Sequence, residues 1–265
     1  MIFQDFEFAG EKLSDYGFMV CSYDGGSDFE TMTMGGDLVF TTVSEYNGKH
    51  WLLVNAGYEE ALTATFYICP NPCVYGDEYR ITDDVHRWVM RWLNRPTFEV
   101  FRPLRRDNAV FYNGSFVVKA QLYNGRHIGY ELTLQTDRPF GYGETEEFEF
   151  EADEETTFKM LDSSDEIGDI YPHMEVTCDE AGDLVITNSM DENYSTIITG
   201  CEAGETIVFD HPLITTDATA HKLPQCFNYD FPRISNTYDE NTNIFTFSIP
   251  CSVKMSYNPI RKVGI

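Results

Sequence analysis

The sequence lacks the features that identify several large classes of protein. No run of about 18 apolar residues occurs in its 265 residues, so no segment is expected to cross a bilayer as a helix. The segment MIFQDFEFAG has neither the basic region nor the apolar core of a signal peptide. Basic residues are few, because 18 Lys and Arg stand against 44 Asp and Glu, which gives a formal net charge of −26. Such a surface repels phosphates and anionic lipids, so we expect no specific nucleic-acid binding and no membrane insertion.

Motifs of the common enzyme and nucleotide-binding families are also absent. The sequence contains no G-x-S-x-G, no glycine-rich phosphate loop ending in Lys-Ser or Lys-Thr, and no H-E-x-x-H. Its many carboxylates leave room for the paired acids of a glycosidase, but such a pair has meaning only when its geometry is known. We therefore predict a protein that is not an enzyme and that has no cofactor and no catalytic residue.

Seven cysteines are present, which is an odd number for a disulfide framework: Cys21, Cys69, Cys73, Cys178, Cys201, Cys226 and Cys251. Without an export signal, this count indicates reduced thiols in a cytosol. Cys69 and Cys73 form the one close pair, and their spacing is compatible with metal ligation. A metal site normally needs further ligands nearby, and the nearest histidines, His50 and His86, stand alone. We therefore favour structural thiols and predict no metal site.

Two Asp- and Asn-rich segments resemble cation-binding loops without matching them. Residues 24–28 (DGGSD) offer oxygen ligands, although a plain surface turn explains them as well. Residues 239–243 begin like a calcium loop, but Ile244 replaces the required glycine and Pro250 occupies the position of the final glutamate. An Asx-rich turn is the better interpretation of this second segment.

The composition favours a β-rich globular protein. Hydrophobic residues make up 42% of the chain and aromatic residues 15%, which is enough to bury a core and favours strands. Asn113-Gly114 and Asn124-Gly125 separate alternating apolar runs, so they predict a three-stranded meander over residues 110–135. Further short strands are expected at residues 175–177, 184–187, 196–199 and 206–209. Short strands punctuated by turns are typical of a sandwich or jelly roll.

One helix is predicted against this background, over residues 82–94. Thr82 is suited to cap its N-terminus, and Pro96 follows its end. Trp88 and Trp92 lie one turn apart on its apolar face. They anchor the helix on a sheet in one interpretation, and in the other they contact a second subunit, because tryptophan is enriched in interface hot spots. The apolar face comprises Ile81, Val85, Trp88, Val89, Trp92 and Leu93.

A domain boundary is predicted near residues 136–145. Residues 1–136 contain 18 acidic and 11 basic residues (net −7), whereas residues 137–265 contain 26 and 7 (net −19). Separate domains often differ in charge in this way. The acidic run that follows the boundary interleaves with Phe148 and Phe150, so we expect it to form the solvent face of a strand. The predicted domains are 1–136 and 137–265.

The last segment, residues 227–265, has the pattern of a closing hairpin of a β-sandwich. An aromatic entry leads to an Asn- and Asp-rich turn and then to a strongly alternating strand. Arg261 and Lys262 then form a short basic tail in an acidic chain. This tail suits a subunit contact or, equally, a frayed and solvated terminus.

Motifs spread over nearly the whole chain resemble the distal tail proteins of long-tailed siphophages. The order and spacing of these motifs carry the resemblance. They are Phe6-Glu7-Phe8-Ala9-Gly10 with Ser14-Asp15-Tyr16-Gly17; Arg91-Trp92-Leu93 before the strand Phe98-Glu99-Val100-Phe101; the turn Asn124-Gly125; Gly204-Glu205 with Val208-Phe209-Asp210; and the ending from Phe231-Pro232 to Pro259.

This resemblance implies a viral structural protein of the tail tip, or baseplate, of a virion. The implied fold is mainly β with one prominent helix (β-rich α+β): an N-terminal ring-forming β domain plus a C-terminal galectin-like β-sandwich. Members form homo-hexameric rings, single or stacked, through the N-terminal domain. Their implied partners are the tail-tube protein, the tail-tip hub protein and receptor-binding proteins, and assembly takes place in the host cytoplasm.

A carbohydrate-binding β-sandwich protein for host-surface recognition is the alternative. Sugars stack on aromatic rings, but no tryptophan follows Trp92. The second half would therefore depend on its tyrosines. The candidates are Tyr171, Tyr194, Tyr229, Tyr238 and Tyr257.

Overall fold

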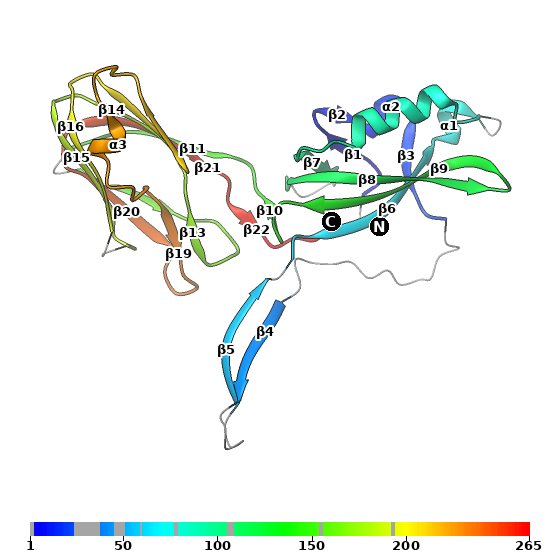
Figure 1. Cartoon of the computed structure of the whole chain (residues 1–265), viewed down its shortest axis with the longest axis horizontal. Helices are drawn as coiled ribbons and strands as arrows, with labels where there is room; N and C mark the ends of the chain where they lie inside the picture. The colour runs from blue at the N-terminus through cyan, green and yellow to red at the C-terminus, as the bar shows by residue number, and fades with distance from the viewer. Residues whose placement is uncertain are drawn as a thin grey trace. The chain divides into compact units, whose positions relative to one another are not determined.

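The computed structural model describes residues 3–23, 38–44, 51–58, 60–76, 79–104, 109–153, 156–191 and 194–265. The backbone is mainly β, as the sequence predicts, and α2 is its one long helix in these ranges (Figure 1). The chain divides into two units: Met1–Gly143 with Arg261–Ile265, and Glu144–Ile260. No helix in the described part of the chain is long and apolar enough to cross a membrane.

A seven-stranded antiparallel sheet forms the centre of the first unit, in the order β2-β1-β7-β8-β9-β6-β3. Helix α2 packs against β8, and a separate hairpin is formed by β4 and β5. The strands of the sheet are β1 (Phe6–Phe8), β2 (Glu11–Lys12), β3 (Phe18–Cys21), β6 (Thr63–Pro70), β7 (Glu99–Pro103), β8 (Tyr112–Tyr123) and β9 (Arg126–Thr136). The other elements are the 3-10 helix η1 (Leu13–Tyr16), β4 (Leu38–Ser44), β5 (Trp51–Tyr58), α1 (Pro72–Tyr75), α2 (Asp83–Leu93) and β10 (Gly141–Tyr142).

Of the two predicted Asn-Gly turns, one is confirmed and the other is wrong. Asn124 and Gly125 have φ angles of 49° and 76°, and they join β8 to β9. Asn113 and Gly114 instead lie inside β8, where both are paired with β7. A side chain at Gly114 would come within 2.6 Å of Leu134 Cδ1, so glycine serves close packing at this position rather than a turn.

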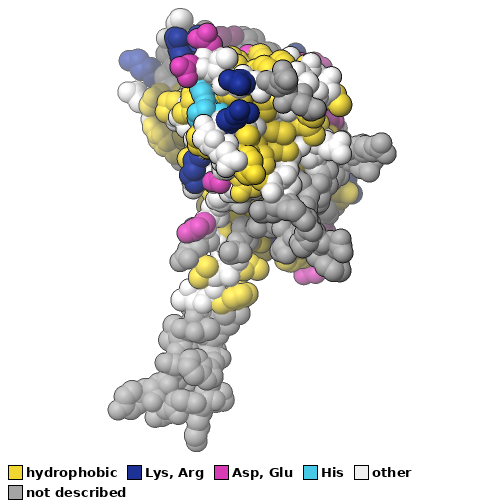
Figure 2. Space-filling model, turned by 90° about the vertical axis from the view of Figure 1, so that its right-hand side faces the viewer, with side chains coloured by type: hydrophobic (Ala, Val, Ile, Leu, Met, Phe, Trp, Pro, Cys, Tyr) yellow, Lys and Arg dark blue, Asp and Glu magenta, His cyan; other side chains and the backbone are white. Residues whose placement is uncertain are grey.

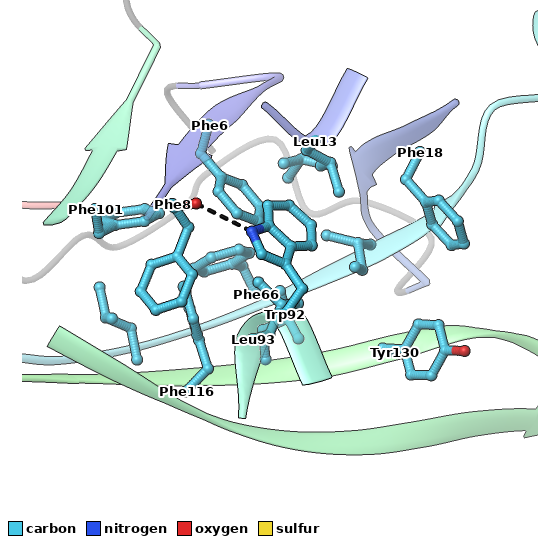
Figure 3. Packing of buried hydrophobic residues seen from close by; sticks show 14 of the residues in the cluster. Phe6, Phe8, Leu13, Phe18, Phe66, Trp92, Leu93, Phe101, Phe116 and Tyr130 are labelled. Carbon is cyan, nitrogen blue, oxygen red and sulfur yellow. Dashed lines mark hydrogen bonds between the residues drawn. The ribbon is translucent and has the colours of Figure 1, made fainter. Parts of the chain in front are cut away.

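Aromatic side chains dominate the core of the first unit (Figure 3). Several of their rings meet edge to face, such as those of Phe8 and Phe116, whose centroids are 5.0 Å apart. This arrangement fills the space between the sheet and α2 and is favoured by the ring quadrupoles. The phenylalanines no more than 2% exposed are Phe6, Phe8, Phe66, Phe101 and Phe116.

The second unit contains a five-stranded and a four-stranded antiparallel sheet. Their orders are β11-β21-β14-β17-β18 and β12-β20-β15-β16, and buried residues from both form one core. The five-stranded sheet comprises β11 (Glu146–Ala152), β14 (His173–Cys178), β17 (Thr206–Asp210), β18 (Leu213–Thr216) and β21 (Cys251–Tyr257). The four-stranded sheet comprises β12 (Phe158–Leu161), β15 (Gly182–Asn188), β16 (Ser195–Cys201) and β20 (Thr242–Phe247). The remaining elements are β13 (Gly168–Ile170), β19 (Ile234–Asn236), which pairs with it, and the short helix α3 (Leu223–Cys226).

The prediction of a closing hairpin is wrong. The strands on either side of the Asn- and Asp-rich turn do not pair with each other, because β19 pairs with β13 in a sheet of its own, and the predicted alternating strand is divided into β20 and β21, which belong to different sheets. β20 pairs with β12 and β15, whereas β21 pairs with β11 and β14. Each strand buries alternate side chains, among them Phe245 and Phe247 on β20 and Val253 and Met255 on β21. Both strands contribute these residues to one core, so the link between them crosses from one sheet to the other.

The acidic run forms the outer face of β11, as predicted. Glu147, Glu149 and Glu151 are exposed, and they alternate with the half-buried Phe148 and Phe150. The ring of Phe150 stacks on that of Phe158 with centroids 3.8 Å apart.

The C-terminal tail is not a frayed terminus. β22 (Ile260–Arg261) leads the chain from the second unit back to the first. There Val263 and Ile265 pack against the aromatic core, and the Tyr112 hydroxyl donates a hydrogen bond to the Val263 carbonyl. Lys262 Nζ lies 5.4 Å from the centroid of the Phe140 ring.

Candidate functional site

Helix α2 carries the two tryptophans that the sequence singles out. Thr82 caps it, with Oγ1 accepting a hydrogen bond from the Val85 amide at 3.5 Å. Asp83 and Asp84 occupy the first turn and Arg91 the last, which complements the helix dipole. The predicted helix is thus present between Asp83 and Leu93.

Trp92 is a core residue. It is 3% exposed, and its Nε1 donates a hydrogen bond to the carbonyl oxygen of Phe8 at 3.0 Å (Figure 3). Its ring stacks on Phe6 with centroids 5.9 Å apart and an interplanar angle of 10°. Trp92 therefore anchors α2 on β1, which is the packing role that the sequence offered as one of two interpretations.

Trp88 lies one turn earlier and is half-buried. Its ring stacks on Trp92 with centroids 5.3 Å apart and lies 4.1 Å from the Tyr16 centroid. These rings line a cleft with a volume of about 620 Å³. Charged side chains of both signs flank this aromatic surface. The charged lining residues are Glu11, Arg91, Arg95 and Glu99.

A histidine of this helix is paired with a histidine of strand β9. The rings of His86 on α2 and His127 on β9 have centroids 4.3 Å apart, and the Tyr130 hydroxyl lies 3.0 Å from His86 Nδ1. Burial lowers the pKa of His86, and the neighbouring His127 lowers it further. Figure 2 shows histidine side chains between hydrophobic patches and a few Lys and Arg side chains.

Two hairpins of the first unit expose apolar side chains that the sequence analysis did not single out. In β4, Leu38 and Phe40 are 50% and 58% exposed. At the end of the β8–β9 hairpin, Leu122 and Tyr123 are 55% and 68% exposed. Leu122 continues the alternation of the buried β8 positions Tyr112, Gly114 and Phe116, so only the tertiary structure shows that it lies outside the core.

Cys69 and Cys73, which were considered as metal ligands, have different surroundings in the structure. Cys73 is exposed on α1, whereas the Cys69 thiol interacts with that of Cys21 on the neighbouring strand β3. His50 and residues 24–28 lie outside the described residues.

The segment that begins like a calcium loop forms a buried amide network instead. Asn243 is fully buried, and its Oδ1 accepts hydrogen bonds from the Ser235 amide at 2.8 Å and from Asn188 Nδ2 at 2.6 Å. Its Nδ2 donates to the Ser235 carbonyl at 2.9 Å and to the Asn241 carbonyl at 3.1 Å. Because Asn243 bonds to protein groups, its oxygen is not free to ligate a cation.

The tyrosines considered for glycan stacking are not equivalent. Tyr257 is 4% exposed and belongs to the core, so the prediction that it could serve as a sugar-stacking platform is wrong. Tyr171 stacks on His211 at 3.9 Å, and the guanidinium of Arg233 lies over the Tyr194 ring at 4.3 Å. The two most exposed members of the set are Tyr229 (63%) and Tyr238 (75%).

Both halves of the chain match family models of phage tail proteins. Residues 1–138 match the model described as phage tail protein N-terminal domain, and residues 140–257 match the phage tail C-terminal domain. A search of curated proteins gives no match.

Two solved structures from phages share the fold over almost their whole length. The SPP1 Dit protein, described as a paradigm of the hub adsorption apparatus in phages that infect Gram-positive bacteria, is 14% identical, with a TM-score of 0.64. The alignment covers 97% of this chain and 99% of that chain. A chain of the phage p2 baseplate, in its activated conformation with Sr, is 8% identical with a TM-score of 0.50, covering 96% and 98%.

The resemblance to distal tail proteins that the sequence motifs indicated is thus confirmed in the fold. The family matches extend over nearly all of the chain, so the protein belongs to the phage tail protein family, with a fold similar to that of SPP1 Dit.

Proposed function

We propose that this chain is a distal tail protein, a non-enzymatic component of the tail tip of a phage or phage-like particle. In this role it forms a homo-hexameric ring that joins the tail tube to the baseplate and its receptor-binding proteins. The observation that carries the proposal is the agreement of fold over 97% of the chain with SPP1 Dit, together with the family match of both halves. The N-terminal unit builds the ring, and the C-terminal sandwich carries other tip proteins.

The surface of the first unit supports an assembly role. Half-exposed aromatic and apolar side chains occur on α2, on β4 and at the end of the β8–β9 hairpin. Apolar side chains on hairpins are a liability in a monomer, because exposed edges and patches favour association. In a closed ring, the exposed apolar side chains of each copy would be covered by the neighbouring copy.

Negative-stain microscopy and light scattering of the purified full-length chain test the ring. The expected result is sixfold rings with a mass six times that of the 30.4 kDa chain. Monodisperse monomers at every concentration would contradict the proposal. Mixing with the tail-tube protein of the same particle, followed by co-sedimentation, tests the partner.

Trp88 is the residue we place at a subunit contact. The variant Trp88→Ala should shift the ring toward smaller species, because truncating an interface tryptophan commonly costs about 2 kcal/mol or more in binding. Met90→Ala is the matched control, since Met90 is 42% exposed on another face of the same helix. If both variants assemble like the wild type, Trp88 is not a ring contact, and the interface lies elsewhere on the first unit. Trp92→Ala is unsuitable here, because it also removes a core anchor.

A further inference from the structure

The second unit brings a thiol, a carboxylate and an imidazole together inside the sandwich. Cys201 ends β16, Glu205 precedes β17, and His221 lies between β18 and α3. One ligand atom from each lies within 4.8 Å of the others. Cys201 is 3% exposed, and the side chains of Glu205 and His221 are 0% and 5% exposed. His221 is 16 positions from Glu205 in sequence, and neither the fold comparison nor the assembly role requires the group.

We propose that Cys201, Glu205 and His221 bind a zinc ion that staples the second unit. A thiolate, an imidazole and a carboxylate are all established Zn²⁺ ligands, and zinc prefers four of them in a tetrahedron. The Cys226 thiol interacts with the His221 ring, and a water molecule or this thiol would supply the fourth ligand. The Cys178 thiol in turn interacts with that of Cys201, so three of the seven cysteines gather at this point.

The hydrogen bonds around the group fix the orientation of its side chains, as the hydrogen bonds behind metal ligands do in known metal sites. His221 Nε2 lies 3.0 Å from the Thr199 carbonyl oxygen, which can only accept, so Nε2 carries a proton. This bond turns Nδ1 toward the carboxylate, which it meets at 2.6 Å from Glu205 Oε1. The carboxylate is fixed in turn by the Glu202 amide, 2.9 Å from Oε2, and by the Thr216 hydroxyl. A backbone carbonyl on the second ring nitrogen is the usual partner of a metal-bound histidine.

Without metal, the same atoms form a buried imidazolium–carboxylate pair in which Nδ1 donates to Glu205. Zinc would replace the Nδ1 proton and the Cys201 thiol proton, so binding releases two protons and leaves the three ligands and the ion electrically neutral. The Nδ1 and Oε1 atoms, now 2.6 Å apart, would separate to about 3.3 Å, the edge of a tetrahedron with zinc–ligand bonds of about 2.05 Å.

The test is metal binding by the full-length, reduced chain. Mass spectrometry of metal content after gel filtration should give about one zinc per chain, by the one-site geometry. Titration of the chelator-treated protein with Co²⁺ alone should produce a thiolate-to-cobalt charge-transfer band, and two protons should be released for each ion bound. Zinc should also raise the unfolding temperature of the second unit, because it binds the folded state.

Variants assign the ligands. Cys201→Ser should weaken the charge-transfer band, and His221→Gln should reduce zinc affinity by about tenfold or more. Cys73→Ser and His173→Gln are the matched controls, since both residues lie on the surface, and they should bind zinc like the wild type. The proposal is overturned if the wild-type chain binds neither Zn²⁺ nor Co²⁺ stoichiometrically. It is equally overturned if the Cys201→Ser, His221→Gln double variant binds them as tightly as the wild type. The wild-type measurements decide whether the chain binds zinc even if a variant fails to fold. Ring assembly is measured separately, so failure of the zinc proposal can be told apart from failure of the proposed tail function.

Discussion

The indole Nε1 of Trp92 donates a hydrogen bond to the carbonyl oxygen of Phe8 at 3.0 Å, joining residues 84 positions apart in sequence. Through it the one long helix in the described part of the chain is fixed to the short first strand of the sheet. Because Trp92 also stacks on Phe6, one side chain combines core packing with satisfaction of a buried carbonyl.

Replacing Trp92 should therefore destabilise the first unit strongly. Trp92→Ala should lower the free energy of unfolding by about 3–5 kcal/mol, as expected for a large buried aromatic side chain. Trp92→Phe keeps a ring but removes the hydrogen bond to the Phe8 carbonyl, which should cost about 1 kcal/mol. Urea denaturation followed by fluorescence of the remaining tryptophans, which all precede residue 93, reports on this unit. Met90→Ala should change the stability by no more than about 0.5 kcal/mol, and a loss for Trp92→Ala that is no larger would contradict the assigned role.

The C-terminal tail should contribute to the stability of the first unit, although it follows the second in sequence. Deleting residues 262–265 removes the partly buried Val263 and Ile265 and should cost about 2 kcal/mol, less than full burial of two such side chains is worth. Tyr112→Phe removes the hydroxyl that bonds to Val263 and should cost about 1 kcal/mol. Tryptophan fluorescence in urea measures both changes. A frayed tail would leave the midpoint unchanged in both variants.

Gly129 should tolerate no side chain. A Cβ there would lie 2.2 Å from the backbone oxygen of Ile68 and 2.0 Å from the Tyr23 hydroxyl. Since the backbone of β6 cannot move away without breaking its pairing with β9, Gly129→Ala should cost about 3 kcal/mol, at the upper end for overpacking. Gly57→Ala is the control, because no atom lies within 4 Å of a Cβ at that strand position. Thermal unfolding of both variants compares them, and equal midpoints would show that the strands separate easily at Gly129.

His86 should make the stability of the first unit depend on pH. Burial and His127 lower its pKa, and Asp83 opposes them in part, while Tyr130 faces its ring from β9. The unfolded chain, with an ordinary pKa of about 6.5, takes up the proton before the folded chain does. The free energy of unfolding should therefore fall as the pH drops below about 6.5 and stay flat from this source above it.

The variant His86→Asn, which cannot be protonated, should flatten that profile. Urea denaturation between pH 7.5 and pH 5 measures it, with Tyr130→Phe as a variant that removes a ring partner and keeps the titrating group. If wild type and His86→Asn lose stability in parallel as the pH falls, another group causes the loss.

Local sequence patterns correctly predicted the elements that are determined by their own residues, without contacts from distant parts of the chain. The helix between Thr82 and Asn94 follows from its cap, its charges and its apolar spacing, and it is present with nearly those bounds. The turn at Asn124-Gly125 follows from the need for two positive φ angles. The same dipeptide at Asn113-Gly114 misled the prediction, because the space beside Leu134 rather than the turn required a glycine.

The candidate sites depended far more on contacts that are remote in sequence. Of the cysteines, spacing drew attention to Cys69 and Cys73, whereas the structure gathers Cys201 and Glu205, at the connection from β16 to β17, with His221, which lies between β18 and α3. Cys201 and Glu205 are as close in sequence as Cys69 and Cys73, but they are not a pair of cysteines, and His221 follows 16 positions after Glu205. A search for paired cysteines and histidines along the chain therefore does not find the group. Likewise, Tyr257 was indistinguishable in sequence from the exposed tyrosines, and its burial is set by its strand's place in the sandwich.

The sequence by itself determined the β-rich class, the single long helix and the membership in a phage tail family, since these rest on composition, periodicity and the order of local motifs. Tertiary structure alone decided that β20 and β21 enter opposite sheets, that Trp92 is buried while Trp88 is half-exposed, and that the last residues return to the first unit. The physical reason is the same in each case: strand partners and burial are fixed by which apolar faces can cover one another, and that choice is made between segments far apart in the chain.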